Sequence, residues 1–111
     1  TSNNNFISSS PSLINTNLTN EHADQSLTLC EIGFNAGLSA VLLLEAAPEA
    51  RAISFDIDAF PWTRPAASLV RRAYNHGRFL GVVFGDSART IPEYRRKHPA
   101  FQCDMMFVDG A

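Results

Sequence analysis

The sequence predicts an α/β fold, in which a parallel β-sheet carries helices on both of its faces. Two observations support this prediction. Short apolar runs alternate along the chain with segments of helical character. These runs are almost continuously apolar, which is typical of parallel strands buried on both faces. Because connections between such strands are right-handed, the strand order 3-2-1-4 is allowed, which is the first half of a doubly wound sheet.

The first strand and helix are predicted before residue 48. Residues 27–32 (LTLCEI) form a short apolar run that ends at Gly33, as expected of a buried strand. Residues 36–47 (AGLSAVLLLEAA) are apolar on almost every side, and Pro48 stops the pattern. This pattern predicts a helix packed closely on a sheet.

The second strand and helix follow the same scheme. Residues 51–56 (RAISFD) predict a strand. Residues 65–77 predict a helix, since Pro65 is tolerated in a first turn and Gly77 suits a C-terminus. The apolar positions of this segment repeat with helical spacing, at Ala66, Leu69, Val70, Ala73 and Tyr74.

Two further strands enclose a third helix. Residues 78–84 (RFLGVVF) and 103–108 (CDMMFV) predict strands, and residues 90–98 predict the helix between them. The spacing of Thr90 and Glu93 matches a capping box, in which each side chain bonds a free backbone N–H at the helix start.

Residues 1–26 differ in composition from the rest of the chain of 111 residues. Residues 1–20 contain no charged side chain, and fourteen of them are Asn, Ser or Thr. Such a segment lacks the apolar area that would offset the entropy of ordering it. We therefore predict a disordered polar lead-in over residues 1–26 and one folded domain over residues 27–111.

Charge and cysteine content favour a cytoplasmic protein without nucleic-acid or membrane partners. The formal charge is −2, and no segment resembles a membrane span or a secretory signal. Cys30 and Cys103 lie far apart and form no C-x-x-C pair. We expect them to be buried free thiols rather than a disulfide or a metal site, in agreement with a reducing cytosol.

Acidic residues and glycines gather where the predicted strands end. They are Glu31 and residues 33–37 at the first strand, Asp56 and Asp58 at the second, Asp86 and Ser87 at the third, and Asp109 at the fourth. The carboxyl ends of parallel strands share one edge of a sheet, where such folds bind ligands. We therefore expect a ligand site along this edge.

The residues of this edge fit a nucleoside without phosphates. A triphosphate loop needs a Gly-Lys pair, which the chain lacks, and Asn35 stands where a dinucleotide motif has its second glycine. Gly33 and Gly37 instead leave space for a smaller ligand, and the helix start offers N–H groups to a carboxylate. Asp56, nineteen residues after Gly37, is placed to accept hydrogen bonds from ribose hydroxyls.

Four motifs in order resemble the class I S-adenosylmethionine-dependent methyltransferases. They are E-x-G-x-x-x-G at residues 31–37, the acid that ends SFD, GDS at residues 85–87 and DMMFVDG at residues 104–110. Within that class, EIGFNAG, SFDI and FVDG are most similar to small-molecule methyltransferases related to catechol O-methyltransferase. The resemblance covers residues 27–110 and implies a Rossmann-like fold. Because the chain begins without Met and stops at Ala111, we expect it to be cut before strands 5–7 of that fold.

The resemblance also implies roles for the residues around the methionine end of the cofactor. Glu31 supports the glycine turn and holds the cofactor's ammonium, directly or through water. Ser39 holds the carboxylate at the helix start. The methionine moiety is lined by Gly33, Phe34, Asn35 and Gly37.

At the adenosine end, the resemblance assigns the ribose to Asp56 and one face of the adenine to Ile57. Asp86 accepts from the exocyclic amine, with Ser87 beside it, and Asp109 lies near the transferred methyl group. In cation-dependent O-methyltransferases an acid in the place of Asp109 binds a divalent metal, but their other ligands lie further along. We therefore assign no metal, and the methyl acceptor is expected to be a small molecule of unknown identity.

Structural roles are the alternatives at several positions. The two glycines can serve only a tight turn and close helix packing. Asp58 can cap the following loop, Asp86 can be a helix N-cap with Ser87, and Asp109 can be a turn residue. Phe60 and Trp62 are expected to pack within their loop rather than to form an aromatic platform.

Two other functions stay open on the sequence alone. One is a Rossmann domain that binds a nicotinamide or flavin nucleotide, although Asn35 fits that motif poorly. The other is a truncated fragment without activity.

Overall fold

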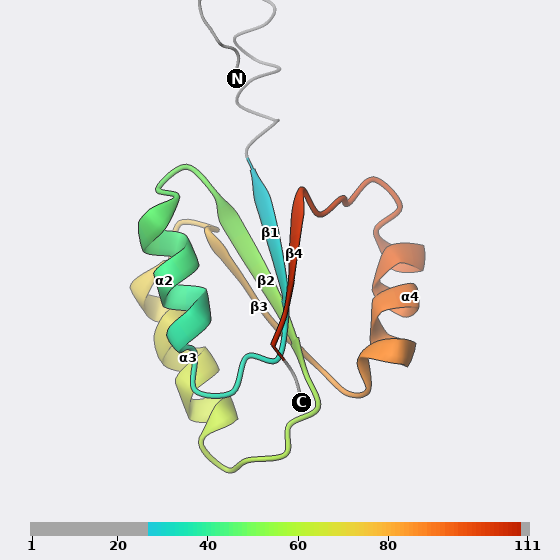
Figure 1. Ribbon diagram of the computed structural model, residues 1–111, viewed down its shortest axis with the longest axis horizontal. Helices are drawn as coiled ribbons and strands as arrows, with labels where there is room; N and C mark the ends of the chain where they lie inside the picture. Colours follow the sequence, from blue (N-terminus) through green and yellow to red (C-terminus); the bar gives the residue numbers. More distant parts are fainter. Residues whose placement is uncertain (1–26, 110–111) are drawn as a thin grey trace, which may run out of the picture.

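The computed structural model describes residues 27–109 and has an α/β fold (Figure 1). Its four strands form one parallel sheet in the order β3-β2-β1-β4, which confirms the predicted order. The predicted lead-in, residues 1–26, lies outside the described residues. The strands are β1 (Thr28–Ile32), β2 (Arg51–Asp56), β3 (Phe79–Phe84) and β4 (Met105–Val108), and the helices are α2 (Leu38–Ala46), α3 (Thr63–Ala73) and α4 (Ser87–Lys97).

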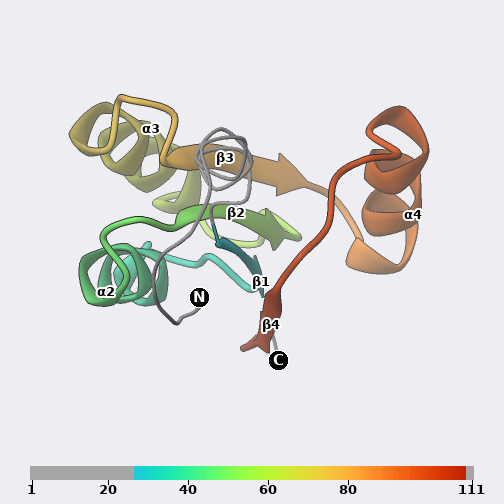
Figure 2. The ribbon, with the colours of Figure 1, turned by 90° about the horizontal axis from the view of Figure 1, so that it is seen from above.

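The helices cover both faces of the sheet, as predicted. Helices α2 and α3 lie on one face and α4 lies on the other (Figure 2). On the first face the core contains Leu29, Phe34, Leu44 and Phe79. On the second face Cys30, Ile53 and Phe55 are buried beneath α4. None of the helices described within residues 27–109 is long and apolar enough to cross a membrane.

The parallel register brings the carboxyl ends of all four strands to one edge. Glu31 of β1 lies between Ser54 of β2 and Phe107 of β4. The chain leaves every strand at this edge, which lies at the bottom of Figure 1. We call this edge the rim.

Helix α4 begins earlier than the sequence predicts. It starts at Ser87, and Asp86 is its N-cap, because the Asp86 carboxylate accepts a hydrogen bond of 3.0 Å from the Ala88 amide. The predicted capping box is therefore wrong. Thr90 is buried inside the helix, and Glu93 forms an ion pair with Arg89 instead of reaching back to a helix start.

Helix α3 is also displaced toward the N-terminus relative to its prediction. It spans Thr63–Ala73 and not residues 65–77. Pro65 lies within the first turn, where its missing N–H breaks no intrahelical bond. Gly77 lies beyond the helix, in a turn with φ of 82°.

The expectation of free thiols is wrong, because Cys30 and Cys103 form a disulfide. Their Cα atoms are 5.7 Å apart although the residues are 73 positions apart in sequence. Strand β4 lies beside β1, so the segment that enters β4 passes next to the buried Cys30. The argument for a reducing cytosol from free thiols therefore no longer holds.

Candidate functional site

The rim contains a cavity of about 420 Å³ that is bordered by residues following all four strands. We call it the rim cavity. Its volume lies within the range of roughly 300–1,000 Å³ that is common for small-molecule sites. Seven of the predicted site residues line it, namely Gly33, Asn35, Asp56, Ile57, Asp86, Ser87 and Asp109.

Asp56 connects the loops that follow β1 and β2. Its side chain is 9% exposed, and Oδ2 accepts a hydrogen bond of 2.8 Å from the backbone N–H of Asn35. Oδ1 accepts a second hydrogen bond, of 2.7 Å, from the N–H of Asp58. Since each carboxylate oxygen has two acceptor positions, Asp56 can still accept from two hydroxyl groups of a ligand.

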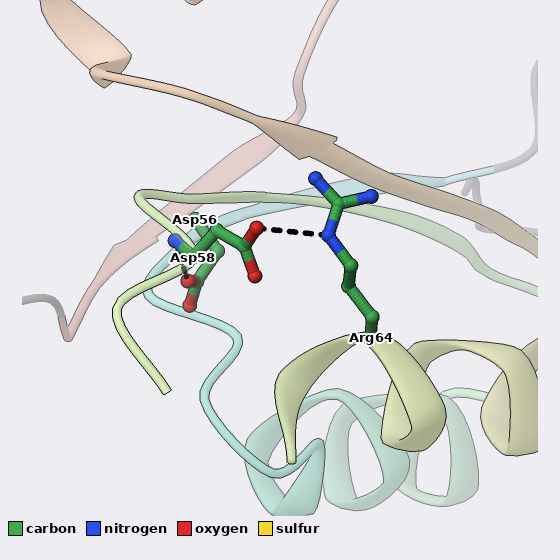
Figure 3. Close-up of polar contacts among 3 residues, drawn as sticks. All are labelled: Asp56, Asp58 and Arg64. Atoms are coloured by element: carbon green, nitrogen blue, oxygen red, sulfur yellow. Dashed lines mark hydrogen bonds and ion pairs between the residues drawn. The ribbon is translucent and has the colours of Figure 1, made fainter. Parts of the chain in front are cut away.

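Asp58 serves a different purpose although it is only two residues away. It adopts a left-handed φ of 65°, and its carboxylate accepts from Arg64 Nε at 2.8 Å (Figure 3). The Arg64 guanidinium in turn lies 4.1 Å above the ring centre of Phe84. Asp58 therefore links the β2 loop to α3, and it is not among the residues that line the rim cavity.

Both glycines of the turn after β1 have a left-handed φ, 100° at Gly33 and 93° at Gly37, which favours glycine. Gly37 is the N-cap of α2 with φ of 93°, and a Cβ there would lie 2.8 Å from the ring of Phe34. Phe34 itself is buried in the core and stacks on Phe79 at 5.7 Å. Phe34 and Gly37 thus support the turn from the core side, and neither is among the residues that line the rim cavity.

Asn35 occupies the middle of this turn with a left-handed φ of 54°. Its side-chain oxygen accepts a hydrogen bond of 2.7 Å from the indole N–H of Trp62. Trp62 also stacks on Phe60, with ring centres 4.6 Å apart and planes 7° apart. Phe60 lines the rim cavity, although the sequence did not predict it as a site residue; the available signal was an aromatic pair in the loop that follows Asp56.

The loop after β3 brings Asp86 to the same cavity. Gly85 has φ of 134°, and a Cβ there would lie 2.8 Å from Cγ2 of Thr90, so this position requires glycine. The Gly85 N–H donates to the carbonyl of Asp56 at 2.9 Å, which joins the loops after β2 and β3. Asp86 uses Oδ1 as the helix cap, so its other oxygen is free to accept from a ligand.

Glu31 lies in a separate cavity, on the α2 face of the sheet. This α2 cavity measures about 490 Å³ and is lined by Glu31, Ser39, Phe107 and Asp109 together with apolar residues of α2. Glu31 is 1% exposed, and its Oε1 accepts 2.7 Å from the Ser54 hydroxyl. Its Oε2 is buried and has no hydrogen-bond partner among the described residues.

The environment of Glu31 favours its neutral form. Burial raises the pKa of this carboxyl above its ordinary value of 4.5, and the negative charges of Asp109 and Asp56 act in the same direction. The hydroxyls of Ser54 and Ser39 lower the pKa but do not outweigh burial. A buried carboxyl with one unpaired oxygen is therefore present beside the rim, and a cationic group would stabilise its ionised form.

The structure thus divides the predicted site residues between two cavities and the core. Asp109 is the one predicted residue that lines both cavities. Within residues 27–109, no three His, Cys, Asp or Glu side chains come close enough together to hold a metal ion.

Comparisons of the chain with models of protein families, with characterised proteins and with solved structures found no match. The geometry of the rim is therefore the basis on which a function can be proposed.

Proposed function

We propose that the chain is the cofactor-binding part of an S-adenosylmethionine-dependent methyltransferase of Rossmann-like fold, acting on a small-molecule acceptor. The observation that carries the proposal is the position of Asp56. This carboxylate ends the strand next to β1, is bonded to the glycine turn and faces a cavity of ligand size. A ribose held there would lie over the carboxyl ends of β2 and β1, at the edge of the sheet where open α/β folds bind ligands.

The adenosine end of the cofactor fits the rim cavity by its donors and acceptors. Asp56 retains acceptor positions for two ribose hydroxyls, and Asp86 retains one oxygen for an exocyclic amine. Ile57 is 68% exposed at this edge, and an adenine ring would cover its apolar surface. All three residues line the cavity.

The amino-acid end of the cofactor fits the α2 cavity. The unpaired Oε2 of Glu31 would gain a partner in an α-ammonium group, and this pairing would offset the burial of its charge. Ser39 lies in the first turn of α2, where backbone N–H groups without helical partners favour a carboxylate. Asp109 lines both cavities and is therefore placed where the two ends of one ligand meet.

The reaction would require little covalent chemistry from the chain. Bound S-adenosylmethionine supplies a methyl group on a positively charged sulfur, and this charge is lost when the methyl group is transferred. The residues of the rim would bind and orient the ligand, and such positioning can account for a large share of a rate enhancement. Asp109 is the proposed catalytic group, by its position between the two cavities.

Calorimetry with S-adenosylhomocysteine tests the proposal on the full chain. This compound is the cofactor after methyl transfer, and it keeps the same adenosine and amino-acid groups. We expect saturable binding at one site, and no displacement by a nicotinamide dinucleotide. If a folded sample binds the dinucleotide but not S-adenosylhomocysteine, or binds neither, the proposal is wrong.

A further inference from the structure

We infer that Phe60, held in place by Trp62, is the platform on which the nucleobase of the ligand stacks in the rim cavity. The inference rests on the proposed function and adds to it a residue that supplies affinity for the base. The two rings pack against each other in their loop, as the sequence predicts. Three observations favour an additional role for Phe60.

The first reason is exposure. Phe60 is 44% exposed and Trp62 is 48% exposed, so their packing against each other leaves surface open on both residues. The two rings are nearly parallel, so each covers one face of the other. Phe60 lines the rim cavity and Trp62 does not, so Phe60 is the member of the pair that a ligand in the cavity would contact.

The second reason is rigidity. The indole of Trp62 donates to the Asn35 side chain at 2.7 Å, and the carbonyl of Trp62 accepts from the Ala66 amide at 3.0 Å, which fixes it to the start of α3. Asn35 is itself bonded through its backbone N–H to Asp56. A chain of contacts therefore runs from the proposed ribose acceptor to the aromatic pair. Phe60 stacks on the ring fixed in this way and therefore loses little freedom when a ligand binds.

The third reason is complementarity with Asp86. An aromatic ring offers a face to any base, and stacking of this kind is tolerant of base identity. Asp86 lines the same cavity and has a free carboxylate oxygen, which selects a base that carries an amine. Phe60 would thus supply affinity for the face of the base, while Asp86 reads its edge.

The test compares two ligands that differ only in the base. S-adenosylhomocysteine contains adenine, whereas S-ribosylhomocysteine has a hydroxyl group in its place. Stacking on an aromatic side chain strengthens binding by about 5- to 150-fold per base. We expect Phe60→Leu to lower the affinity for S-adenosylhomocysteine by a factor in this range and to leave the affinity for S-ribosylhomocysteine within about two-fold. Phe60→Tyr should restore the affinity for S-adenosylhomocysteine.

Trp62 provides a second measurement because it is the only tryptophan in the chain. Its fluorescence should change when the wild-type chain binds S-adenosylhomocysteine and stay constant with S-ribosylhomocysteine. This measurement needs no substitution, so it remains available if Phe60→Leu fails to fold. Because Trp62 stacks on Phe60, an unchanged fluorescence with bound S-adenosylhomocysteine, or an equal change with both ligands, would overturn the inference.

The outcomes separate this inference from the proposed function. If the wild-type chain binds S-adenosylhomocysteine but Phe60→Leu binds it equally well, the inference is wrong and the proposed function stands. If Phe60→Leu lowers the affinity for both ligands equally, the Phe60 ring supports the turn and does not stack on the base. This result would also overturn the inference. If the folded wild-type chain binds neither ligand, both the proposed function and the inference fail.

Discussion

Removing the disulfide between Cys30 and Cys103 should lower the stability of the domain substantially. The bond connects residues 73 positions apart, and it restricts the unfolded chain more than the folded one. For a loop of this length the chain-entropy relation gives about 4 kcal/mol. This is a large part of the roughly 5–15 kcal/mol that separates folded from unfolded states in most domains.

Cys103→Ser is the suitable substitution because Cys103 is exposed, whereas Cys30 is completely buried. A hydroxyl at position 103 can be hydrated, so the variant loses the covalent bond without gaining a buried polar group. The pairing of β4 with β1 persists, and so do the two hydrogen bonds between Thr28 and Asp104, at 2.7 and 2.8 Å. We therefore expect the variant to keep its fold while unfolding more easily.

Urea unfolding of three samples measures this effect: the oxidised wild type, the wild type with a reducing agent, and Cys103→Ser. We expect the last two to agree, with a free energy of unfolding about 4 kcal/mol below the first. The slope with urea should rise in both, because an unfolded chain without the cross-link exposes more surface. Equal midpoints for all three samples, or two titratable thiols in the untreated wild type, would refute this reasoning.

Two further substitutions test the turn and the buried acid. Gly37→Ala should destabilise the domain by about 1–3 kcal/mol, since its Cβ meets Phe34 and its φ of 93° is strained for alanine. Gly77→Ala is the matched control, with φ of 82° and no atom within 4 Å of the added Cβ, so an equal loss in both variants, measured by urea unfolding, would contradict the packing argument. Glu31→Gln should become more stable relative to wild type as the pH rises above 4.5, the ordinary pKa of this carboxyl. The folded state raises that pKa and binds the proton more tightly than the unfolded state, so the contribution of Glu31 to wild-type stability is fully present below 4.5 and is lost as the pH rises through the folded pKa. If the difference in melting temperature between Glu31→Gln and the wild type does not vary with pH, the charge of Glu31 does not destabilise the domain.

Much of the fold follows from local patterns in the sequence. Continuous apolar runs identified the strands, and the handedness of their connections allowed the observed strand order. The position of Asp56 at the rim follows from this topology alone, because a residue that ends a parallel strand must lie at the carboxyl edge.

Features that depend on tertiary contacts could not be predicted in this way. The pairing of Cys30 with Cys103 requires β4 to lie beside β1, and no local spacing encodes that neighbourhood. The start of α4 was only partly predictable, because the capping box at Thr90 and an N-cap at Asp86 both satisfy local rules; Asp86 caps the helix, as the alternative interpretation of the sequence had it, and Thr90 is buried. The burial of Phe34 likewise depends on its contact with Phe79, which is distant in sequence.

The central claim is that Asp56 receives the ribose of an adenosyl ligand, and one comparison of variants tests it most directly. Asp56→Asn and Asp58→Asn each remove one negative charge from the same loop, but only Asp56 lines the rim cavity, while Asp58 pairs with Arg64. Hydrogen bonds to a charged acceptor contribute about 1.5–3 kcal/mol, so we expect Asp56→Asn to weaken S-adenosylhomocysteine by about 10- to 100-fold in calorimetry, with Asp58→Asn near wild type. If both folded variants bind as tightly as the wild type, or if Asp58→Asn has the larger effect, the ribose is not held by Asp56.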